Sequence, residues 1–433
     1  MNRRTFIQSS AIAMASGMTA RGANDRINVG VIGVRGRGRD HINCYAKLKE
    51  ARVAAICDID QAQIERAVQL TEKVTGAKPQ KTYQDLRRLF DDKDIDAVSI
   101  ATCNHWHALA TIWACQAGKD VYVEKPACHN IFEGRKMVEA ARKYNRMVQV
   151  GMQSRTTDHK IRAIQMLHEG VIGKVYMARG LCFKRRKSIG HGENGPVPPG
   201  VDYNTWLGPA PMRPFNPNRF HYNWHWFWDT GNGDIGNQGV HEMDIARWGL
   251  NKKALPPVVV SDGGKFIYND DQETPNTQLA TFRYDDSELV FEVRGILTGG
   301  ESSIAYDGSN FIGNLFYGSD GWMSLDMRGC QIYKGEDRKL VQEFSHTEPE
   351  EWDTTPHIHN FLKAVQSRNH KDLTCDIEEG YLSAALVHMA NISYRTGRKL
   401  HFDPHTERFV HDDEANSYIS RKYREPFVVP EKV

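Results

Sequence analysis

The chain has 433 residues, of which 40% are hydrophobic and 25% are charged, and its formal net charge at pH 7 is +2. These values are ordinary for a globular protein of two or three domains, and they exclude wholesale disorder and a strongly basic surface for nucleic acid. Eight cysteines without a CxxC pair are too few for a disulfide scaffold, and no apolar run of about 20 residues is present to cross a membrane as a helix.

The first 23 residues have the pattern of an export signal. A charged start with the pair Arg3-Arg4 precedes a mild apolar stretch over 9–20 and small residues near Ala23. Adjacent arginines before Phe6 are typical of a twin-arginine signal, which exports folded proteins. We therefore expect a periplasmic protein. The alternative is a disordered N-terminus with a chance arginine pair, and then a cytoplasmic protein.

Residues 24–153 alternate short apolar runs with helical patterns. The predicted strands are Ile27–Ile32, Arg52–Cys57, Ile95–Thr102, Asp120–Glu124 and Met147–Gly151. The predicted helices are 39–50, Gln61–Thr75, His107–Ala117 and Ile131–Tyr144. Strands that alternate with helices imply right-handed βαβ units, so the expected fold is α/β, with a doubly wound parallel sheet of the Rossmann type.

A glycine-rich turn follows the first strand. Gly33, Gly36 and Gly38 let a backbone approach a pyrophosphate at the start of a helix. Arg35 stands where the second glycine of a G-x-G-x-x-G pattern is expected, so the match is imperfect. Asp58 ends the second strand, where a carboxylate binds the adenine ribose hydroxyls of a dinucleotide. The turn and Asp58 together predict NAD binding, while Arg35 and Arg37 keep NADP as an alternative.

After residue 153 the pattern changes, and residues 154–433 are expected to form a second domain. Strand-like runs cover Lys174–Phe183, Pro257–Lys265, Gln278–Tyr284, Glu288–Arg294 and Gln331–Lys334. Helical patterns cover Asp158–Glu169, His357–Gln366 and Ile377–Arg395. Strands joined mostly by hairpins predict a large, open and mostly antiparallel sheet. We expect this domain to bind the substrate and to form a homodimer or homotetramer.

Polar residues follow the later strands of the first half. Asn104 and His107 come after Ile95–Thr102, and Glu124 and Lys125 end the next strand, so all four are expected to line the cofactor site. His105 and His107 lack the spacing of a metal-binding H-E-x-x-H motif, and we predict a role at the helix start and no metal. Most cysteines are expected to be small core residues, with Cys128 as the exception of interest.

An aromatic segment, 221–228, lies in a Gly- and Pro-rich stretch. Aromatic rings pack on the apolar faces of sugars, and we expect Trp224 and Trp226 to contact the substrate. The alternative is that these rings form a hydrophobic plug under a long loop.

Three segments in order resemble the Gfo/Idh/MocA oxidoreductases. They are Cys103-Asn104-His105-Trp106-His107, Glu124-Lys125-Pro126 and the stretch from Gly231 to Asp244. The resemblance covers roughly residues 25–400. It implies hydride transfer between NAD(P) and a hydroxyl of a sugar or cyclitol. It also maps the catalytic lysine and histidine of the family onto Lys125 and His241. The family's aspartate maps onto Asn237, an amide that binds a hydroxyl but accepts no proton, so proton transfer must rest on Lys125, His241 or both.

The residues and the resemblance together predict an exported, NAD(P)-dependent oxidoreductase acting on a carbohydrate, with Lys125, Asn237 and His241 around the substrate. A periplasmic enzyme has little free nicotinamide to draw on, so we expect a tightly bound cofactor. The first alternative is a redox-neutral NAD-dependent glycoside hydrolase, which uses the same oxidation followed by elimination. The second is a non-catalytic sugar-binding protein. Neither a nucleic acid nor a membrane span is expected.

Overall fold

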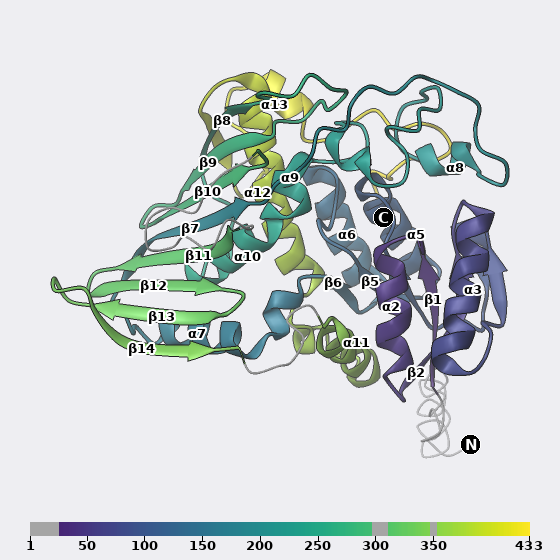
Figure 1. The fold of residues 1–433 in the computed structure, drawn as a ribbon, viewed down its shortest axis with the longest axis horizontal. Helices are drawn as coiled ribbons and strands as arrows, with labels where there is room; N and C mark the ends of the chain where they lie inside the picture. Colours follow the sequence, from purple (N-terminus) through teal and green to yellow (C-terminus); the bar gives the residue numbers. More distant parts are fainter. Residues whose placement is uncertain (1–25, 297–310, 347–352) are drawn as a thin grey trace, which may run out of the picture.

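The computed structural model describes residues 26–296, 311–346 and 353–433, so the predicted signal segment, 1–23, lies outside the described residues. Two sheets organise the chain, and each is covered by helices (Figure 1). The two sheets correspond to the parallel and the mostly antiparallel sheet predicted from the sequence, and the α/β class is confirmed. Among the described residues, no helix has both the length and the apolar character needed to cross a membrane.

The first sheet is parallel and has six strands in the order β3-β2-β1-β4-β5-β6. Its strands are β1 Ile27–Ile32, β2 Ala51–Cys57, β3 Lys81–Tyr83, β4 Ala97–Ile100, β5 Asp120–Val123 and β6 Val148–Val150. Its helices are α2 Arg37–Ala46, α3 Gln61–Thr75, α4 Leu86–Asp91, α5 Asn104–Gln116 and α6 Ile131–Lys143. The strand order reverses between β1 and β4, which creates a crevice at the carboxyl ends of these strands.

Several boundaries differ from the sequence prediction. The helix predicted over 39–50 begins at Arg37 and ends at Ala46, and α5 begins at Asn104 rather than at His107. The short β3 and α4 were not predicted, because neither is long enough to show a period. Seven of the eight cysteines are buried, including Cys128, which lies 3.4 Å from His388 Nε2.

The second sheet has ten strands in the order β14-β13-β12-β11-β7-β10-β9-β8-β15-β16, and only β7 and β10 pair in parallel. Its strands are β7 Val175–Phe183, β8 Val258–Gly264, β9 Thr277–Arg283, β10 Glu288–Arg294, β11 Phe311–Gly318, β12 Gly321–Asp326, β13 Gly329–Lys334, β14 Lys339–Ser345, β15 Leu400–Asp403 and β16 Arg408–Phe409. The sequence prediction missed five of these, namely β11, β12, β14, β15 and β16.

Helices of the later half pack between and beside the two sheets. They are α7 Asp158–His168, α8 Tyr203–Leu207, α9 Gly233–Asn237, α10 Gly239–Gly249, α11 Thr355–Ser367, α12 Ile377–Thr396 and α13 Asp413–Ser417. Short 3-10 turns occur at η1 Gln153–Thr156, η2 Asn223–Trp226 and η4 His370–Asp372. Although α11 lies late in the chain, it packs beside α2 on the parallel sheet (Figure 1), and its Ile358 and Phe361 join the core on that face.

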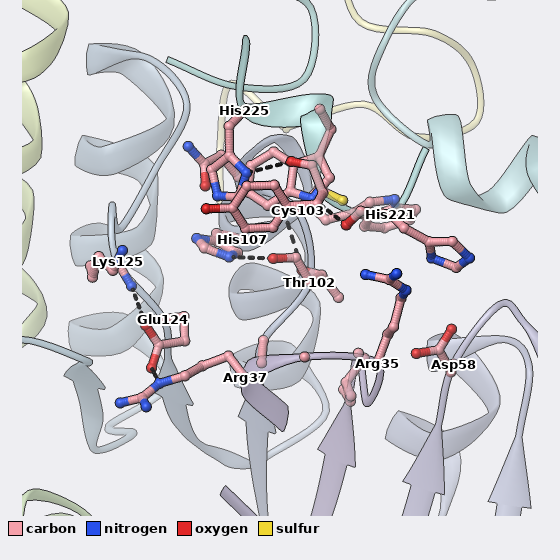
Figure 2. Close-up of a pocket in the computed structure, with 18 of the residues that line it drawn as sticks. Arg35, Arg37, Asp58, Thr102, Cys103, His107, Glu124, Lys125, His221 and His225 are labelled. Atoms are coloured by element: carbon pink, nitrogen blue, oxygen red, sulfur yellow. Dashed lines mark hydrogen bonds and ion pairs between the residues drawn. The ribbon is translucent and has the colours of Figure 1, made fainter. Parts of the chain in front are cut away.

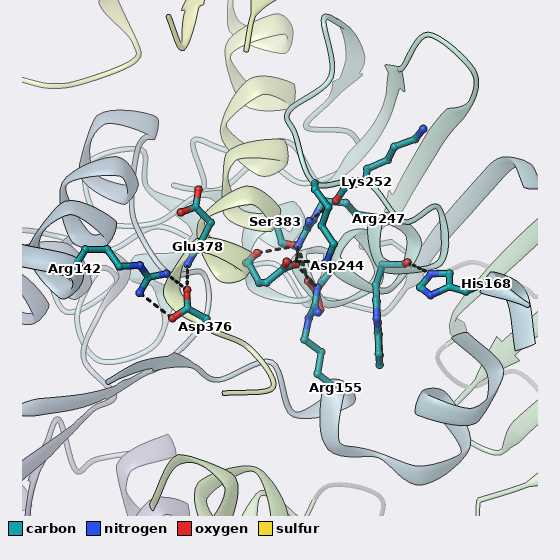
Figure 3. A network of polar contacts seen from close by, with 12 residues as sticks. Arg142, Arg155, His168, Asp244, Arg247, Lys252, Asp376, Glu378 and Ser383 are labelled. Atoms are coloured by element: carbon teal, nitrogen blue, oxygen red, sulfur yellow. Dashed lines mark hydrogen bonds and ion pairs between the residues drawn. The ribbon is translucent and has the colours of Figure 1, made fainter. Parts of the chain in front are cut away.

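A buried polar network holds α10 against α12 (Figure 3). Arg155 in η1 donates to both carboxylate oxygens of Asp244 at 2.9 and 2.8 Å, and the Ser383 hydroxyl donates to the same carboxylate at 2.6 Å. Arg247 reaches Ser383 and Glu379 of α12. A buried charge that lost such a partner would be strongly destabilising, so the network fixes where α10 lies relative to the first sheet.

Candidate active site

The glycine turn between β1 and α2 has the backbone that its sequence requires. Gly33 has φ +82°, and a Cβ there would lie 2.7 Å from the Ala101 carbonyl oxygen. A Cβ on Gly38 would lie 2.2 Å from the Gly33 carbonyl oxygen, so only glycine lets the start of α2 pack on this turn. A Cβ on Gly36, in contrast, meets no atom within 4 Å.

Asp58 lies beside this turn. Its Oδ2 accepts a hydrogen bond from the Val34 backbone N–H at 2.7 Å, and its Oδ1 accepts one from the Asp60 N–H at 3.0 Å. Burial raises the pKa of Asp58 to about 6, although the two backbone N–H groups oppose that rise. The carboxylate is therefore oriented by the backbone and keeps lone pairs for further hydrogen bonds.

One cavity of about 470 Å³ runs along the carboxyl ends of the parallel strands. Most of the predicted site residues line it: Gly33, Arg35, Gly36, Asp58, Asn104, His107, Glu124, Lys125, Trp224, Asn237 and His241. Figure 2 shows Arg35 and Asp58 toward one end of this cavity and Glu124 and Lys125 toward the other. Gly38 and Trp226 do not line it. Gly38 packs beneath the turn, and Trp226 is buried with the Arg186 guanidinium 5.5 Å from its ring centre.

Glu124 is held by Arg37 and His41 of α2. Its Oε1 accepts from Arg37 Nε at 3.0 Å and lies 3.1 Å from His41 Nε2. Burial alone would raise its pKa, but Arg37 and His41 hold the pKa of Glu124 well below its usual value. Glu124 is therefore an anion at neutral pH, and it faces the backbone N–H of Lys125 at 3.3 Å.

Lys125 reaches from the end of β5 to the second half of the chain. Its Nζ donates a hydrogen bond to the backbone carbonyl of Asn237 at the end of α9. Burial, and to a smaller extent Arg37, Arg186 and Lys184, lower the pKa of Lys125 to about 8, against the opposing effect of Glu124. A lysine with this pKa is partly neutral near pH 8 and is suited to take up or release a proton.

His241 lies in the first turn of α10, on the same cavity as Lys125. Its imidazole has no hydrogen-bond partner among the residues that the structure describes, although only 8% of the residue is exposed. Burial, and then the positive charge of Lys125, hold its pKa well below the usual value. The ring is therefore neutral, and its nitrogens are available to a hydroxyl group in the cavity.

The other polar residues at the strand ends connect segments. The amide of Asn104 donates to Asn232 Oδ1 at 3.0 Å. The ring nitrogens of His107 lie 2.7 Å from the Pro126 carbonyl oxygen and 3.1 Å from that of Thr102, and those of His105 face the carbonyls of Trp206 and Thr230. Both histidines thus join loops through backbone carbonyls.

The cavity wall opposite the parallel sheet comes from residues between 184 and 241. Trp224 stacks on His225, with ring centres 3.5 Å apart, and both line the cavity. Reasoning from the sequence missed Gln153, Lys184, Trp206 and Gln238, which also line it. Two of these had a signal in the sequence, because Lys184 directly follows the predicted strand Lys174–Phe183 and Gln238 lies in the stretch from Gly231 to Asp244.

Comparisons with known proteins agree with this geometry. A model described as "Oxidoreductase family, NAD-binding Rossmann fold" matches residues 27–152, and one described as "Oxidoreductase family, C-terminal alpha/beta domain" matches residues 174–429. A solved structure of levoglucosan dehydrogenase with NADH and L-sorbose has the same fold, with a TM-score of 0.67 and 19% identity over 87% of this chain and 99% of the other.

Two curated relatives are similar over part of their length. A protein of Shewanella sp. (strain ANA-3), named glycosyl hydrolase family 109 protein 1, is 32% identical over 152 residues, which are 34% of this chain and 33% of the relative. Inositol 2-dehydrogenase/D-chiro-inositol 3-dehydrogenase of Shouchella clausii (strain KSM-K16) is 34% identical over 163 residues, which are 37% and 44% of the two chains. The matches thus span less than half of these relatives. The two family models together cover most of the chain, and the protein belongs to the Gfo/Idh/MocA family of oxidoreductases.

Proposed function

We propose that this protein transfers a hydride between NAD and a hydroxyl or carbonyl carbon of a sugar, glycoside or cyclitol. The observation that carries the proposal is the position of Lys125. Its amine, with a pKa lowered to about 8, lies in the same cavity as the glycine turn and His241. Alcohol oxidation needs such a group to accept the hydroxyl proton as the hydride leaves carbon.

The residues at one end of the cavity fit a dinucleotide. Gly36 leaves open space toward the cavity, the first N–H groups of α2 point toward the same turn, and Asp58 presents a carboxylate to ribose hydroxyls. When bound, the nicotinamide cofactor supplies the hydride acceptor or donor. Asp58 repels a 2′-phosphate, so NAD is preferred over NADP. Arg35 is exposed beside Asp58 and is the residue that would moderate this preference.

The residues at the other end fit a polyol. Neutral Lys125 accepts the hydroxyl proton during oxidation and returns it during carbonyl reduction. The neutral imidazole of His241 hydrogen-bonds the same or the adjacent hydroxyl. The amide of Asn237 is placed beside them as a binding group, and Trp224 with His225 forms the wall against which a sugar ring packs.

We further propose that the enzyme is exported with its cofactor and assembles as a homodimer or homotetramer. The arginine pair at Arg3-Arg4 supports export of a folded protein. The outward face of the ten-stranded sheet supports assembly, because Val260 and Leu279 on neighbouring strands are 41% and 48% exposed. Cell fractionation and light scattering of the purified protein test these two statements.

The primary experiment incubates the purified full chain with NAD and a panel of aldoses, alkyl glycosides and inositols, and follows nicotinamide reduction. We expect reduction with at least one member. Sugars that bind, detected by calorimetry, without any nicotinamide reduction would instead support the non-catalytic sugar-binding alternative.

Cofactor choice is tested separately with Asp58→Asn, which removes the charge and keeps one oxygen to accept from one of the two backbone N–H groups. The NADP-to-NAD ratio of dissociation constants should fall at least about tenfold, which corresponds to about 1.4 kcal/mol. An unchanged ratio would show that Asp58 does not contact the adenine ribose.

The redox-neutral glycoside hydrolase is a second candidate, because the Shewanella relative is named a glycosyl hydrolase. Product analysis separates the two activities. A keto sugar or lactone with a reduced partner indicates the oxidoreductase, whereas free sugar and aglycone without net redox change indicates the hydrolase.

A further inference from the structure

Three side chains of types that can bind a metal ion, Asp158, His159 and His346, come together, and none of them lines the cavity. Figure 1 shows α7, which carries the first two, beside the edge of the ten-stranded sheet. Asp158 and His159 are the first residues of α7, and His346 follows the last residue of β14. His346 Nδ1 lies 3.0 Å from Asp158 Oδ1 and 3.2 Å from His159 Nδ1, and the remaining Oδ1–Nδ1 distance is 3.6 Å.

These distances match the spacing of ligands around one tetrahedral metal ion. Zinc bonds to imidazole nitrogen and carboxylate oxygen are about 2.0–2.1 Å long, so two ligand atoms on the same ion are separated by about 3.3 Å. The three observed separations fall on either side of that value. Two imidazole nitrogens with one carboxylate are a donor set that favours zinc over magnesium or calcium.

The orientation of His159 is a second, independent indication. Its Nε2 lies 2.9 Å from the carbonyl oxygen of Asp326, at the end of β12. A carbonyl only accepts, so Nε2 carries the proton, and in the neutral ring the lone pair is on Nδ1, which faces Asp158 and His346. A metal-binding histidine commonly donates its other N–H to a backbone carbonyl in this way.

The ring of His346 also turns its Nδ1 toward Asp158 and His159. Its Nε2 is buried without a hydrogen-bond partner among the described residues, so the contacts of Nδ1 are the ones that position the ring. Asp158 Oδ1 accepts a hydrogen bond from the His159 backbone N–H at 2.6 Å, and it also faces His346 Nδ1. Between the two imidazole nitrogens, a proton on His346 Nδ1 or a bound cation offsets the repulsion between lone pairs.

We propose that Asp158, His159 and His346 bind one zinc ion, with a water or other small ligand in the fourth position. The side chains of His159 and His346 are 1% and 11% exposed, and Asp158 is 43% exposed, so the ion has a route from solvent through the Asp158 side. The site joins the start of α7 to the end of β14, and beside it Asp326 anchors His159 to β12. The bound ion therefore cross-links α7 to the edge of the ten-stranded sheet. Its ligands do not line the cavity of the proposed hydride-transfer site.

The test uses the full-length protein, freed of metal with a chelator and titrated with zinc by calorimetry. We expect one equivalent of zinc to bind and to raise the melting temperature, and cobalt to give the visible spectrum of a tetrahedral site. Magnesium in excess should not displace either ion. Asp158→Asn and His346→Ala should each weaken zinc binding at least about tenfold, because even residues behind the ligands change affinity by about 10- to 100-fold.

His191→Ala is the matched control, because His191 forms an exposed histidine–carboxylate pair with Asp271 at 2.7 Å but has no second histidine in its contacts. This variant should keep the full zinc affinity. Circular dichroism without metal verifies that each variant folds, and Asp158→Asn is the variant least able to disturb folding. The proposal is overturned if the wild-type protein binds no zinc, if both ligand variants bind it as the wild type does, or if His191→Ala loses it equally.

Discussion

At the scale of single residues, the pKa of Lys125 depends on where the fold places its amine. Nothing in the tripeptide Glu124-Lys125-Pro126 lowers a lysine pKa. The lowering to about 8 comes first from burial and then from Arg37, Arg186 and Lys184, two of which follow β7 in the other half of the chain. The same burial leaves His241 neutral beside it.

Replacing Lys125 with methionine should separate catalysis from cofactor binding. Methionine keeps much of the apolar stem but carries no proton, so the rate should fall by at least about 10²-fold while NAD stays bound. Single-turnover kinetics and a NAD binding titration measure the two quantities. Near-normal turnover in this variant would contradict the assignment of Lys125.

The pH dependence should report the same amine. Oxidation needs neutral Lys125, so kcat/KM for the sugar should rise with pH through about 8, whereas carbonyl reduction needs the protonated form and should fall through the same range. Lys184→Gln removes a positive charge that lowers this pKa, so its midpoint should move to higher pH. Lys187→Gln, at an exposed position outside the cavity, is the control and should leave the midpoint where it is. A midpoint that is the same in both variants would show that another group titrates.

At the scale of elements, the turn between β1 and α2 has two roles: one of its glycines allows close packing, and another faces the cavity. Gly38 is required by the fold, because its missing side chain lets α2 approach the Gly33 carbonyl. Gly36 is not required by close packing, since no protein atom lies within 4 Å of where its Cβ would stand, but its φ of −120° and ψ of −104° lie outside the regions that L-residues favour. The space beside it belongs to the cavity.

The variants Gly38→Ala and Gly36→Ala should therefore fail in different ways. Gly38→Ala overpacks the turn and should lower the free energy of unfolding by about 1–3 kcal/mol, measured by denaturant titration. Gly36→Ala meets no protein atom, so it should lose less stability than Gly38→Ala, and it should bind NAD more weakly because its methyl group occupies cavity space. If Gly36→Ala bound NAD normally, the dinucleotide would not approach the turn there.

At the scale of the whole molecule, the site depends on segments that are distant in sequence. The carboxyl ends of β1, β2, β4 and β5 form one wall of the cavity, and residues from 184 to 241 form the other. The network around Asp244 and the return of α11 to the parallel sheet hold these walls together. A ligand in the cavity is thus enclosed by both halves of the chain.

This enclosure, together with the proposed export, leads us to expect a cofactor that is never released. The purified protein should contain nicotinamide, and a sugar substrate added alone should reduce it once without steady accumulation of NADH. Continuous turnover should need a second carbonyl substrate. Mass analysis of the denatured protein and stopped-flow absorbance measure these outcomes. Steady NADH formation with rapid cofactor exchange would contradict retention and would weaken the interpretation of the Arg3-Arg4 pair.

The sequence by itself determined the fold class of each half, and most of the residues that it predicted for the site line the cavity. Period-two and period-3.6 patterns are local, so strands such as Glu288–Arg294 and helices such as Gln61–Thr75 were predicted at their observed bounds. Glycines and polar residues at strand ends also predict where a ligand binds, because the carboxyl ends of parallel strands lie at one edge of the sheet.

Only the tertiary structure decided what depends on contacts between distant segments. The pKa of Lys125, the exclusion of Trp226 from the cavity and the packing of α11 on the first sheet all arise from contacts between residues that are distant in the sequence. The meeting of Asp158 and His159 with His346 is of the same kind, since no spacing in the sequence relates them. A sequence pattern records which side of its own element a residue faces, whereas burial and electrostatic fields are sums over neighbours that folding brings together.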